Sequence, residues 1–137
     1  MVLVAADEDT AIAVDVVPGQ ASDAPLLEPM LDATLARVPA VDEVVGDKGF
    51  DGDPQRQACV DRDAFPNIPN KVNRVNRWPF DKGAYRGRNR VERLIGKAKQ
   101  FRRFATRYEK LRSMYLGVVH LVLGFIRLRR LGNVNTP

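Results

Sequence analysis

Apolar and polar positions along the first third of the chain predict a β-hairpin followed by an amphipathic helix. Val2–Ala6 and Ala11–Val17 are short apolar runs, and a polar, acidic turn separates them. From about residue 24 to residue 38, apolar side chains recur at helical spacing, and Ser22 or Asp23 can cap that helix. The order predicted for this part is strand, strand, helix.

A third apolar run leads into an acidic loop. Val41–Val45 predicts a strand, and Gly46–Asp53, which contains three glycines, predicts a loop. Asp53 is followed by a proline, which predicts an N-cap and the first turn of a helix over Gln55–Val60. Phe65–Ile68 has prolines within and after it, which predicts an edge strand.

The second half of the chain changes from strands to helices. Residues 70–83 show no periodicity and predict a loop, whereas residues 86–103 and 110–131 predict two helices. The whole pattern predicts an α/β fold in one domain, with a single sheet packed by helices. Residues 132–137 predict a frayed tail.

The helix predicted over residues 110–131 is apolar around most of its circumference. Its most apolar run, Met114–Ile126, includes His120 and is shorter than the roughly 18 residues that a membrane span needs. A helix of this kind is more often part of a core than an interface, although a surface for oligomerisation remains the alternative. The single cysteine, Cys59, excludes an internal disulfide. The acidic N-terminus lacks the basic start of a signal peptide, so we expect a cytoplasmic protein without a membrane partner.

Charge is divided sharply along the chain. Residues 1–46 carry nine acids and one base, whereas residues 47–137 carry 21 bases and eight acids. Fifteen of those bases lie between Asn70 and Arg112. A charged run is usually a solvated face, but this density of arginine favours a polyanion, because a guanidinium binds phosphate bidentately. Nucleic acid is the leading partner, and charge alone also admits a ribosome-like surface or an acidic protein.

Four polar residues of the predicted helix over 86–103 and its approach share one face. Tyr85, Arg88, Glu92 and Lys99 lie at intervals of three, four and seven, within roughly 60° of one another around a helix. This pattern places one carboxylate among bases at the shoulder of an apolar stripe. By itself, the Arg88–Glu92 spacing equally fits an ordinary ion pair on a solvated helix.

Asp47 is the second candidate, since it follows a predicted strand in a loop flanked by glycines. The carboxyl end of a strand presents side chains to a crevice in α/β proteins. The alternative is a turn aspartate that bonds its own backbone. A carboxylate at a strand end and another on a basic helix would suit Mg²⁺, which takes hard oxygen ligands and DNA phosphate.

These residues resemble a known family. The spacing of Tyr85, Arg88, Glu92 and Lys99 is similar, without gaps, to the tyrosine–arginine–glutamate–lysine pattern of bacterial insertion-sequence DDE transposases. Residues 47–51 (Asp-Lys-Gly-Phe-Asp) resemble the family segment that holds its second catalytic aspartate, with phenylalanine in place of the commoner tyrosine. Residues 17–20 and 103–108 are also similar, so the resemblance covers nearly the whole chain.

The resemblance implies a ribonuclease-H-like mixed sheet flanked by helices over residues 1–131, and a role in DNA transposition. By the same resemblance, Asp47 and Glu92 are the second and third catalytic acids and ligands of Mg²⁺ or Mn²⁺, whereas Tyr85, Arg88 and Lys99 contact DNA. The implied partners are transposon-end and target DNA, and the implied location is the bacterial nucleoid.

One departure from the family concerns its first catalytic aspartate, which lies on the first strand of the sheet. This chain opens at what corresponds to the second strand, so the resemblance implies an N-terminally truncated domain that is inactive alone. Asp7, Asp9 and Asp15 are poor substitutes because of their places in the order of strands. A partner encoded in an upstream frame, or a homo-oligomer, could complete the chain. The alternative function is a non-catalytic, basic nucleic-acid-binding module.

Overall fold

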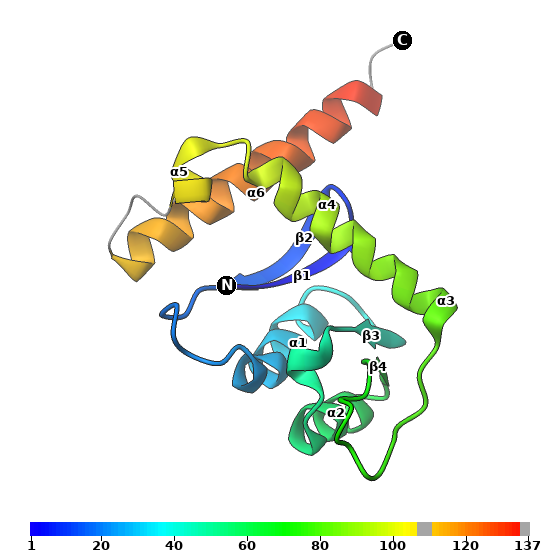
Figure 1. Cartoon of the computed structure of the whole chain (residues 1–137). Helices are drawn as coiled ribbons and strands as arrows, with labels where there is room; N and C mark the ends of the chain where they lie inside the picture. Colours follow the sequence, from blue (N-terminus) through cyan, green and yellow to red (C-terminus); the bar gives the residue numbers. More distant parts are fainter. Residues whose placement is uncertain (107–110, 135–137) are drawn as a thin grey trace. The chain divides into compact units, whose positions relative to one another are not determined.

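The computed structural model describes residues 1–106 and 111–134, and contacts within the chain divide it into two compact units (Figure 1). Unit 1 contains Met1, Leu3–Val17 and the residues from Asn89 onward, and unit 2 contains Val2 and Pro18–Arg88. In chain order the elements are β1 (Val2–Asp7), β2 (Thr10–Asp15), η1 (Ala24–Leu26), α1 (Leu27–Leu35), β3 (Glu43–Val45), η2 (Lys48–Phe50), α2 (Asp53–Val60), β4 (Phe65–Asn67), α3 (Lys82–Tyr85), η3 (Arg86–Arg88), α4 (Asn89–Ala98), α5 (Arg102–Thr106) and α6 (Arg112–Val134).

The α/β class is confirmed, but the prediction of a single sheet is wrong. The described strands form two separate two-stranded sheets, one made of β1 and β2 and the other of β3 and β4. The sheets differ because β1 and β2 are neighbours in a hairpin, whereas β3 and β4 pair in parallel across the intervening α2. Each sheet is covered by helices of its own unit, so each unit buries its own core.

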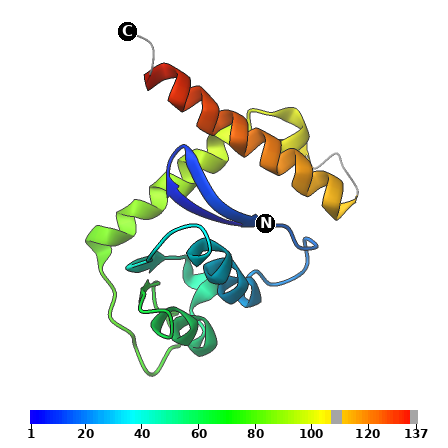
Figure 2. The ribbon, with the colours of Figure 1, turned by 180° about the vertical axis from the view of Figure 1, so that it is seen from behind.

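Unit 1 packs the β1–β2 hairpin against α4 and α6, and Figure 2 shows the same arrangement from behind. Its core is formed by the residue directly after β2 and by residues of α4, α5 and α6: Val16, Leu94, Ala98, Phe104, Tyr115, Val119, Val122, Leu123 and Ile126. The Tyr115 hydroxyl donates to the carbonyl of Phe104 at 3.0 Å, so this buried polar atom is satisfied. The predicted hairpin is confirmed, with boundaries one or two residues from those expected.

Unit 2 packs α1 and α2 beside the parallel pair. Leu27 and Leu31 of α1 meet Cys59 of α2 in a small core, and Val44 of β3 packs against it. Asp63 follows α2 with a φ of 57°, and its left-handed conformation turns the chain sharply into β4. The three-residue strands are short, so this unit depends on polar contacts as well as on its core.

The helix predicted over residues 86–103 is interrupted twice. It begins earlier, as α3 and the 3₁₀ turn η3, and the regular helix α4 runs only from Asn89 to Ala98 before α5 follows. A continuous helix would turn Phe104 about 120° away from Ala98. The break lets both side chains reach the core, where Phe104 is 3% exposed. Burial of the aromatic ring therefore outweighs the hydrogen bonds lost at the break.

Other expected boundaries also change. Asp53 is not the N-cap of α2, which is Gly52, because the Asp53 carboxylate binds Arg74 at 2.6 Å instead. The first helix begins as a 3₁₀ turn with Ser22 Oγ accepting from Ala24 N at 3.3 Å, and α1 ends at Leu35 rather than near residue 38. The predicted tail is residues 132–137; residues 132–134 belong to α6 instead, and residues 135–137 lie outside the described residues. Within residues 1–106 and 111–134, no helix combines the length and apolarity needed to cross a bilayer.

Candidate functional site

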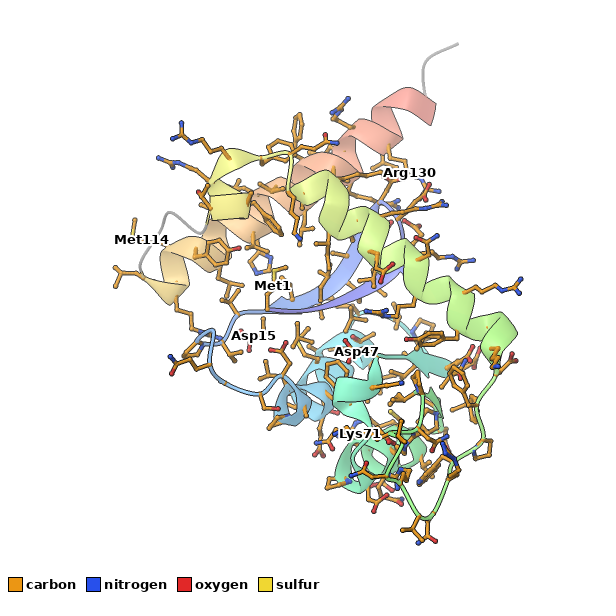
Figure 3. The ribbon with its side chains drawn as sticks, in the orientation of Figure 1. Met1, Asp15, Asp47, Lys71, Met114 and Arg130 are labelled. Carbon is orange, nitrogen blue, oxygen red and sulfur yellow. The ribbon has the colours of Figure 1, made fainter. Side chains whose placement is uncertain are left out.

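Asp47 lies two residues beyond the carboxyl end of β3 and caps the turn η2. Its Oδ1 atom accepts a hydrogen bond from Gly49 N at 2.8 Å, and its side chain is 49% exposed (Figure 3). A Cβ atom at Gly49 would lie 2.9 Å from that oxygen, so any larger residue would displace the carboxylate. One oxygen is therefore fixed by the backbone, and the other remains able to meet a ligand.

Arg88 and Tyr85 accompany Asp47 in unit 2. Arg88 Nη2 lies 3.8 Å from Asp47 Oδ2, which is an ion-pair distance rather than a hydrogen bond. The Tyr85 ring packs edge-on against Phe80 with centroids 5.1 Å apart. Asp81 caps α3 by accepting from Gly83 N at 2.8 Å. Two of the predicted site residues, Asp47 and Arg88, are thus brought together.

Asp51 is the buried acid of this loop. Its carboxylate meets Arg56 Nη2 at 2.6 Å and Arg74 Nε at 2.9 Å, and Oδ2 accepts from Lys71 N at 2.6 Å. Burial alone would raise the pKa of Asp51, but the hydrogen bonds from Lys71, Arg74 and Arg56 outweigh it and lower the pKa below its usual value. Asp51 therefore remains ionised and ties the Asp47 loop to the basic segment 70–81.

Arg56 is completely buried and binds the same oxygen of Asp51, Oδ1, that Arg74 binds. Its Nη2 donates to the carbonyl of Ile68 at 2.8 Å, and its guanidinium lies 5.5 Å from the ring centroid of Trp78. Asp51, Arg56 and Arg74, which we call the buried ion cluster, were missed in the sequence analysis. A usable signal was present: Arg56 and buried Cys59 lie three residues apart in α2, and a charge on an apolar helix face requires a partner.

Two reciprocal side-chain contacts hold the rest of the basic segment. Asn67 donates to the Asp81 carbonyl and accepts from Asp81 N, both at 3.0 Å. Asn70 exchanges the same pair of bonds with Trp78 at 2.9 Å. In the predicted loop over residues 70–83, side-chain amides therefore satisfy backbone groups that a neighbouring strand would satisfy in a sheet. Val72 and Val75 within this loop are about nine-tenths exposed.

Glu92 and Lys99 belong to unit 1. Glu92 is exposed in the first turn of α4, and Lys99 is exposed just after the last helical residue, with its backbone N donating to the Ile95 carbonyl at 2.9 Å. The exposed face between them holds Gly96, where a Cβ would meet nothing within 4 Å. The Arg88–Glu92 spacing spans the boundary of the units, so the predicted four-residue stripe is divided between them. Tyr108 lies outside the described residues.

Acids of the hairpin neutralise bases of α4 and α6. Glu8 binds Arg93 at 2.9 Å and Asp9 binds Lys97 at 2.5 Å, while Asp15 pairs with Arg112. Arg130, labelled in Figure 3, meets Asp7 at 2.9 Å. The division of charge along the chain is therefore not a division between the units. Asp7, Asp9 and Asp15 are each paired with a base, so none of them presents an unpaired carboxylate to a metal.

A divalent cation such as Mg²⁺ binds carboxylate oxygens, but the described residues do not bring enough carboxylates together to form a complete metal site. Within residues 1–106 and 111–134, no three histidine, cysteine, aspartate or glutamate side chains are grouped closely enough to hold a metal. Asp47 matches the ligand chemistry of Mg²⁺, and its side chain is half exposed, with Oδ2 at ion-pair distance from Arg88.

The comparisons with known proteins decide the family. The model of the transposase DDE domain matches residues 1–123. The chain belongs to this transposase family. It is also similar to a putative transposase for insertion sequence element IS6501 from Brucella ovis, with 31% identity over 114 residues, 82% of this chain and 84% of the relative. No solved structure matches the chain.

Membership in the transposase family gives the chain a role in DNA transposition, and the family implies DNA as partner. The prediction of an insertion-sequence DDE transposase is therefore confirmed. The match to residues 1–123 includes the whole Asp47 loop and residues of both units.

The reactivity of the Cys59 thiol tests the packing of unit 2 in this transposase chain. Its side chain is fully buried, and that burial raises the pKa of the thiol to about 11. At pH 8 we expect alkylation by iodoacetamide to be roughly 100-fold slower in the folded chain than in urea, where an ordinary thiol pKa applies. Mass spectrometry of quenched samples measures the two rates. Equal rates would show that the core of unit 2 is open.

Proposed function

We propose that this chain binds transposon-end DNA and supplies the second and third acids, Asp47 and Glu92, of a ribonuclease-H-like DDE catalytic centre. The observation that carries the proposal is the geometry of Asp47. It follows a parallel β-strand, one carboxylate oxygen is held by Gly49 N, and the other lies near Arg88. A backbone-held carboxylate at a strand end is a rigid place for a ligand.

Asp47 and Glu92 would hold divalent ions, Mg²⁺ or Mn²⁺, through carboxylate oxygens. When bound, such ions activate the attacking oxygen and stabilise the leaving oxygen of a phosphodiester. The role of the chain itself is to hold its carboxylates in place. The buried ion cluster performs this for the Asp47 loop, because Asp51 anchors that loop from within.

A third carboxylate is needed, and we propose that it comes from outside the described residues. The three early aspartates are engaged by Arg130, Lys97 and Arg112. The chain by itself is then expected not to cleave transposon-end DNA with Mg²⁺, whereas a form that supplies the third carboxylate is expected to cleave. Cleavage of a labelled transposon end by the chain alone would contradict the proposal that the chain is inactive by itself.

DNA binding is proposed through the basic segments 70–90 and 99–103, with Tyr85, Arg88 and Lys99 as contacts. Lys82, Arg86, Arg90 and Arg102 extend the same segments. We expect Arg93 and Lys97 to contribute less to DNA binding, because Glu8 and Asp9 already neutralise them. Backbone phosphates are the expected targets, because most protein–DNA contacts go to phosphate and sugar.

The second candidate function is a non-catalytic nucleic-acid-binding module. It is favoured by the absence of a three-donor metal group within residues 1–106 and 111–134. The two candidates differ in their response to metal. Under the catalytic proposal, Mg²⁺ or Mn²⁺ perturbs the NMR signals of Asp47 and Glu92 in a DNA-bound form that supplies the third carboxylate. Under the module proposal these signals do not move.

Salt dependence provides a prediction for DNA binding. The logarithm of the association constant should fall linearly with the logarithm of salt concentration, by about 0.9 per phosphate contacted. Arg88→Ala and Lys99→Ala are each expected to reduce that slope by roughly one and to weaken binding similarly for all sequences. Fluorescence anisotropy on a transposon end and on random DNA measures both quantities. Arg37→Ala, in the acidic half of the chain, is the control, and an equal change there would contradict the assignment.

A further inference from the structure

The loop after β4 presents two valines to solvent at its tip, which comprises residues 71–77. Val72 is 89% exposed and Val75 92%, and these are the two most exposed large apolar side chains among the described residues. They begin two consecutive Val-Asn-Arg triplets, residues 72–74 and 75–77. A single exposed valine is ordinary on a protein surface. This pair differs, because it stands on a loop that several side chains hold in place.

Arg74 fastens the tip from within unit 2. Its backbone N donates to the Lys71 carbonyl at 3.1 Å, which closes a tight turn. Its guanidinium donates to the carboxylates of Asp51 and Asp53, at 2.9 and 2.6 Å, and to the Asn76 carbonyl at 3.2 Å. The backbone that carries the two valines is therefore anchored on both sides.

The two triplets use their arginines differently. Arg74 is turned inward to its acids, whereas Arg77 is exposed, as is Lys71 at the other end of the tip, which Figure 3 labels. Asn73 and Asn76 are also exposed. The surface of the tip therefore combines two apolar side chains and two amides, with a base at each end.

We propose that the tip enters the minor groove of DNA, where Val72 and Val75 act as apolar wedges that part neighbouring base pairs and bend the duplex. This inference rests on the proposed DNA-binding function and adds a groove contact to its phosphate contacts. Proteins that bind the minor groove insert apolar side chains between base steps and use arginine, lysine and asparagine to read the groove. The tip contains residues of both kinds.

Charge and shape select this partner. Lys71 and Arg77 fit phosphates on either side of a groove, but valines gain nothing from facing phosphate, and their apolar partners in a duplex are sugars and base faces. A single tight turn is narrower than the helix or two-stranded ribbon that a major groove admits, so it suits the narrower groove. Valine is also stiff about χ1, so its insertion costs little side-chain entropy.

The bend of the DNA is the first test. A transposon-end duplex with a donor and an acceptor dye at its termini should be bent by at least about 20° when the full chain binds. The double variant Val72→Ala, Val75→Ala should bind about tenfold more weakly and leave the duplex nearly straight, because alanine is too short to part the bases. Val72→Ile with Val75→Ile should keep the bend. Straight DNA in the wild-type complex would overturn the proposal, as would an unchanged bend and affinity in the alanine variant.

Leu121→Ala is the matched control, since Leu121 is a large apolar side chain exposed on α6 instead. It should leave both affinity and bend unchanged, and an equal loss there would contradict a specific role of the tip. The alanine variants should melt within about 2 °C of wild type, because the valines are exposed.

Salt dependence separates this inference from the proposed function. The valine variants change no charge, so they should keep the wild-type salt slope, whereas Arg88→Ala and Lys99→Ala reduce it. A chain that binds no DNA would contradict both proposals. Binding with the full salt slope, but with no effect of the valine variants, would contradict the wedge alone.

Base analogues distinguish the two grooves. Inosine in place of guanine removes an amino group from the minor groove, and uracil in place of thymine removes a methyl group from the major groove. Inosine should strengthen binding at least about threefold, because the amino group no longer obstructs the tip, and the alanine variant should lose this gain. No gain, or a gain that the alanine variant keeps, would contradict a minor-groove site. If uracil weakened binding by wild type but not by the alanine variant, the valines would contact thymine methyl groups, which also overturns the proposal.

Discussion

Asp51→Ala is expected to lower the free energy of unfolding of unit 2 by about 3–5 kcal/mol, because it leaves the fully buried guanidinium of Arg56 without its carboxylate. The loss would also release Lys71 N and Arg74, so the segment after β4 should lose its protection from hydrogen exchange first. Denaturant unfolding followed by hydrogen exchange measures both effects.

Asp53→Ala provides the matched control for the buried ion cluster. Asp53 also binds Arg74, at 2.6 Å, but its side chain is 76% exposed. Water screens such a pair, so this substitution should cost no more than about 1 kcal/mol. Similar losses for the two variants would show that the network contributes through exposed pairing, and that burial of Asp51 and Arg56 is not the cause.

The same cluster gives unit 2 a pH dependence with a defined sign. The pKa of folded Asp51 is lowered, whereas an unfolded aspartate titrates with a pKa of about 3.9. The stabilisation is therefore complete above that value and is lost as pH falls through the folded pKa. Unfolding free energies of wild type and Asp51→Asn, measured from neutral to acidic pH, should converge only below about pH 4. Convergence at higher pH would contradict the lowered pKa.

Asp47→Asn and Glu92→Gln are expected to reduce DNA cleavage at least about 100-fold in a form that carries all three proposed acids, which is more than the loss of an outer-shell partner of a metal costs. Both substitutions keep the size and a hydrogen-bond acceptor, so the cap of η2 should survive in Asp47→Asn. Binding to transposon-end DNA should stay within about threefold of wild type, because a single added positive unit changes only one electrostatic contact.

Glu43→Gln is the control for these variants, since Glu43 is an exposed acid of β3 four residues before Asp47. Single-turnover cleavage rates with Mg²⁺ and with Mn²⁺ measure the effect. If Glu92→Gln cleaved at the wild-type rate, the assignment of Glu92 would be wrong. If Glu43→Gln lost as much activity as Asp47→Asn, the defect would reflect loss of negative charge near β3 rather than loss of a ligand.

Much of the local structure could be predicted because it depends on neighbours in the chain. The hairpin, the strand before Asp47, the edge strand at Phe65 and the amphipathic α1 all follow from residue spacing and from proline, glycine and aspartate at fixed offsets. The position of Asp47 after a strand was predicted in the same way. The Asp47–Arg88 approach was not, because 41 positions separate the two residues.

The predictions of secondary structure were wrong where a residue could bind either a local or a distant partner. Asp53 was predicted as a helix cap, yet it binds Arg74 across 21 positions. The basic helix was predicted to be continuous, yet it breaks so that Phe104 can be buried with residues of β2 and α6. In each case a contact absent from the local sequence contributes more than the local preference.

The sequence by itself determined the family, the candidate acids and the order of the elements, because these depend on residue identity and on short-range spacing. Only the tertiary structure decided that Asp51 is buried whereas Asp47 is half exposed. It also decided that hairpin acids neutralise Arg93 and Lys97, and that one face of α6 belongs to the core while the other is exposed. The physical reason is common to all three. The free energy of a charge or an apolar surface depends on what covers it, and the covering residues lie far away along the chain.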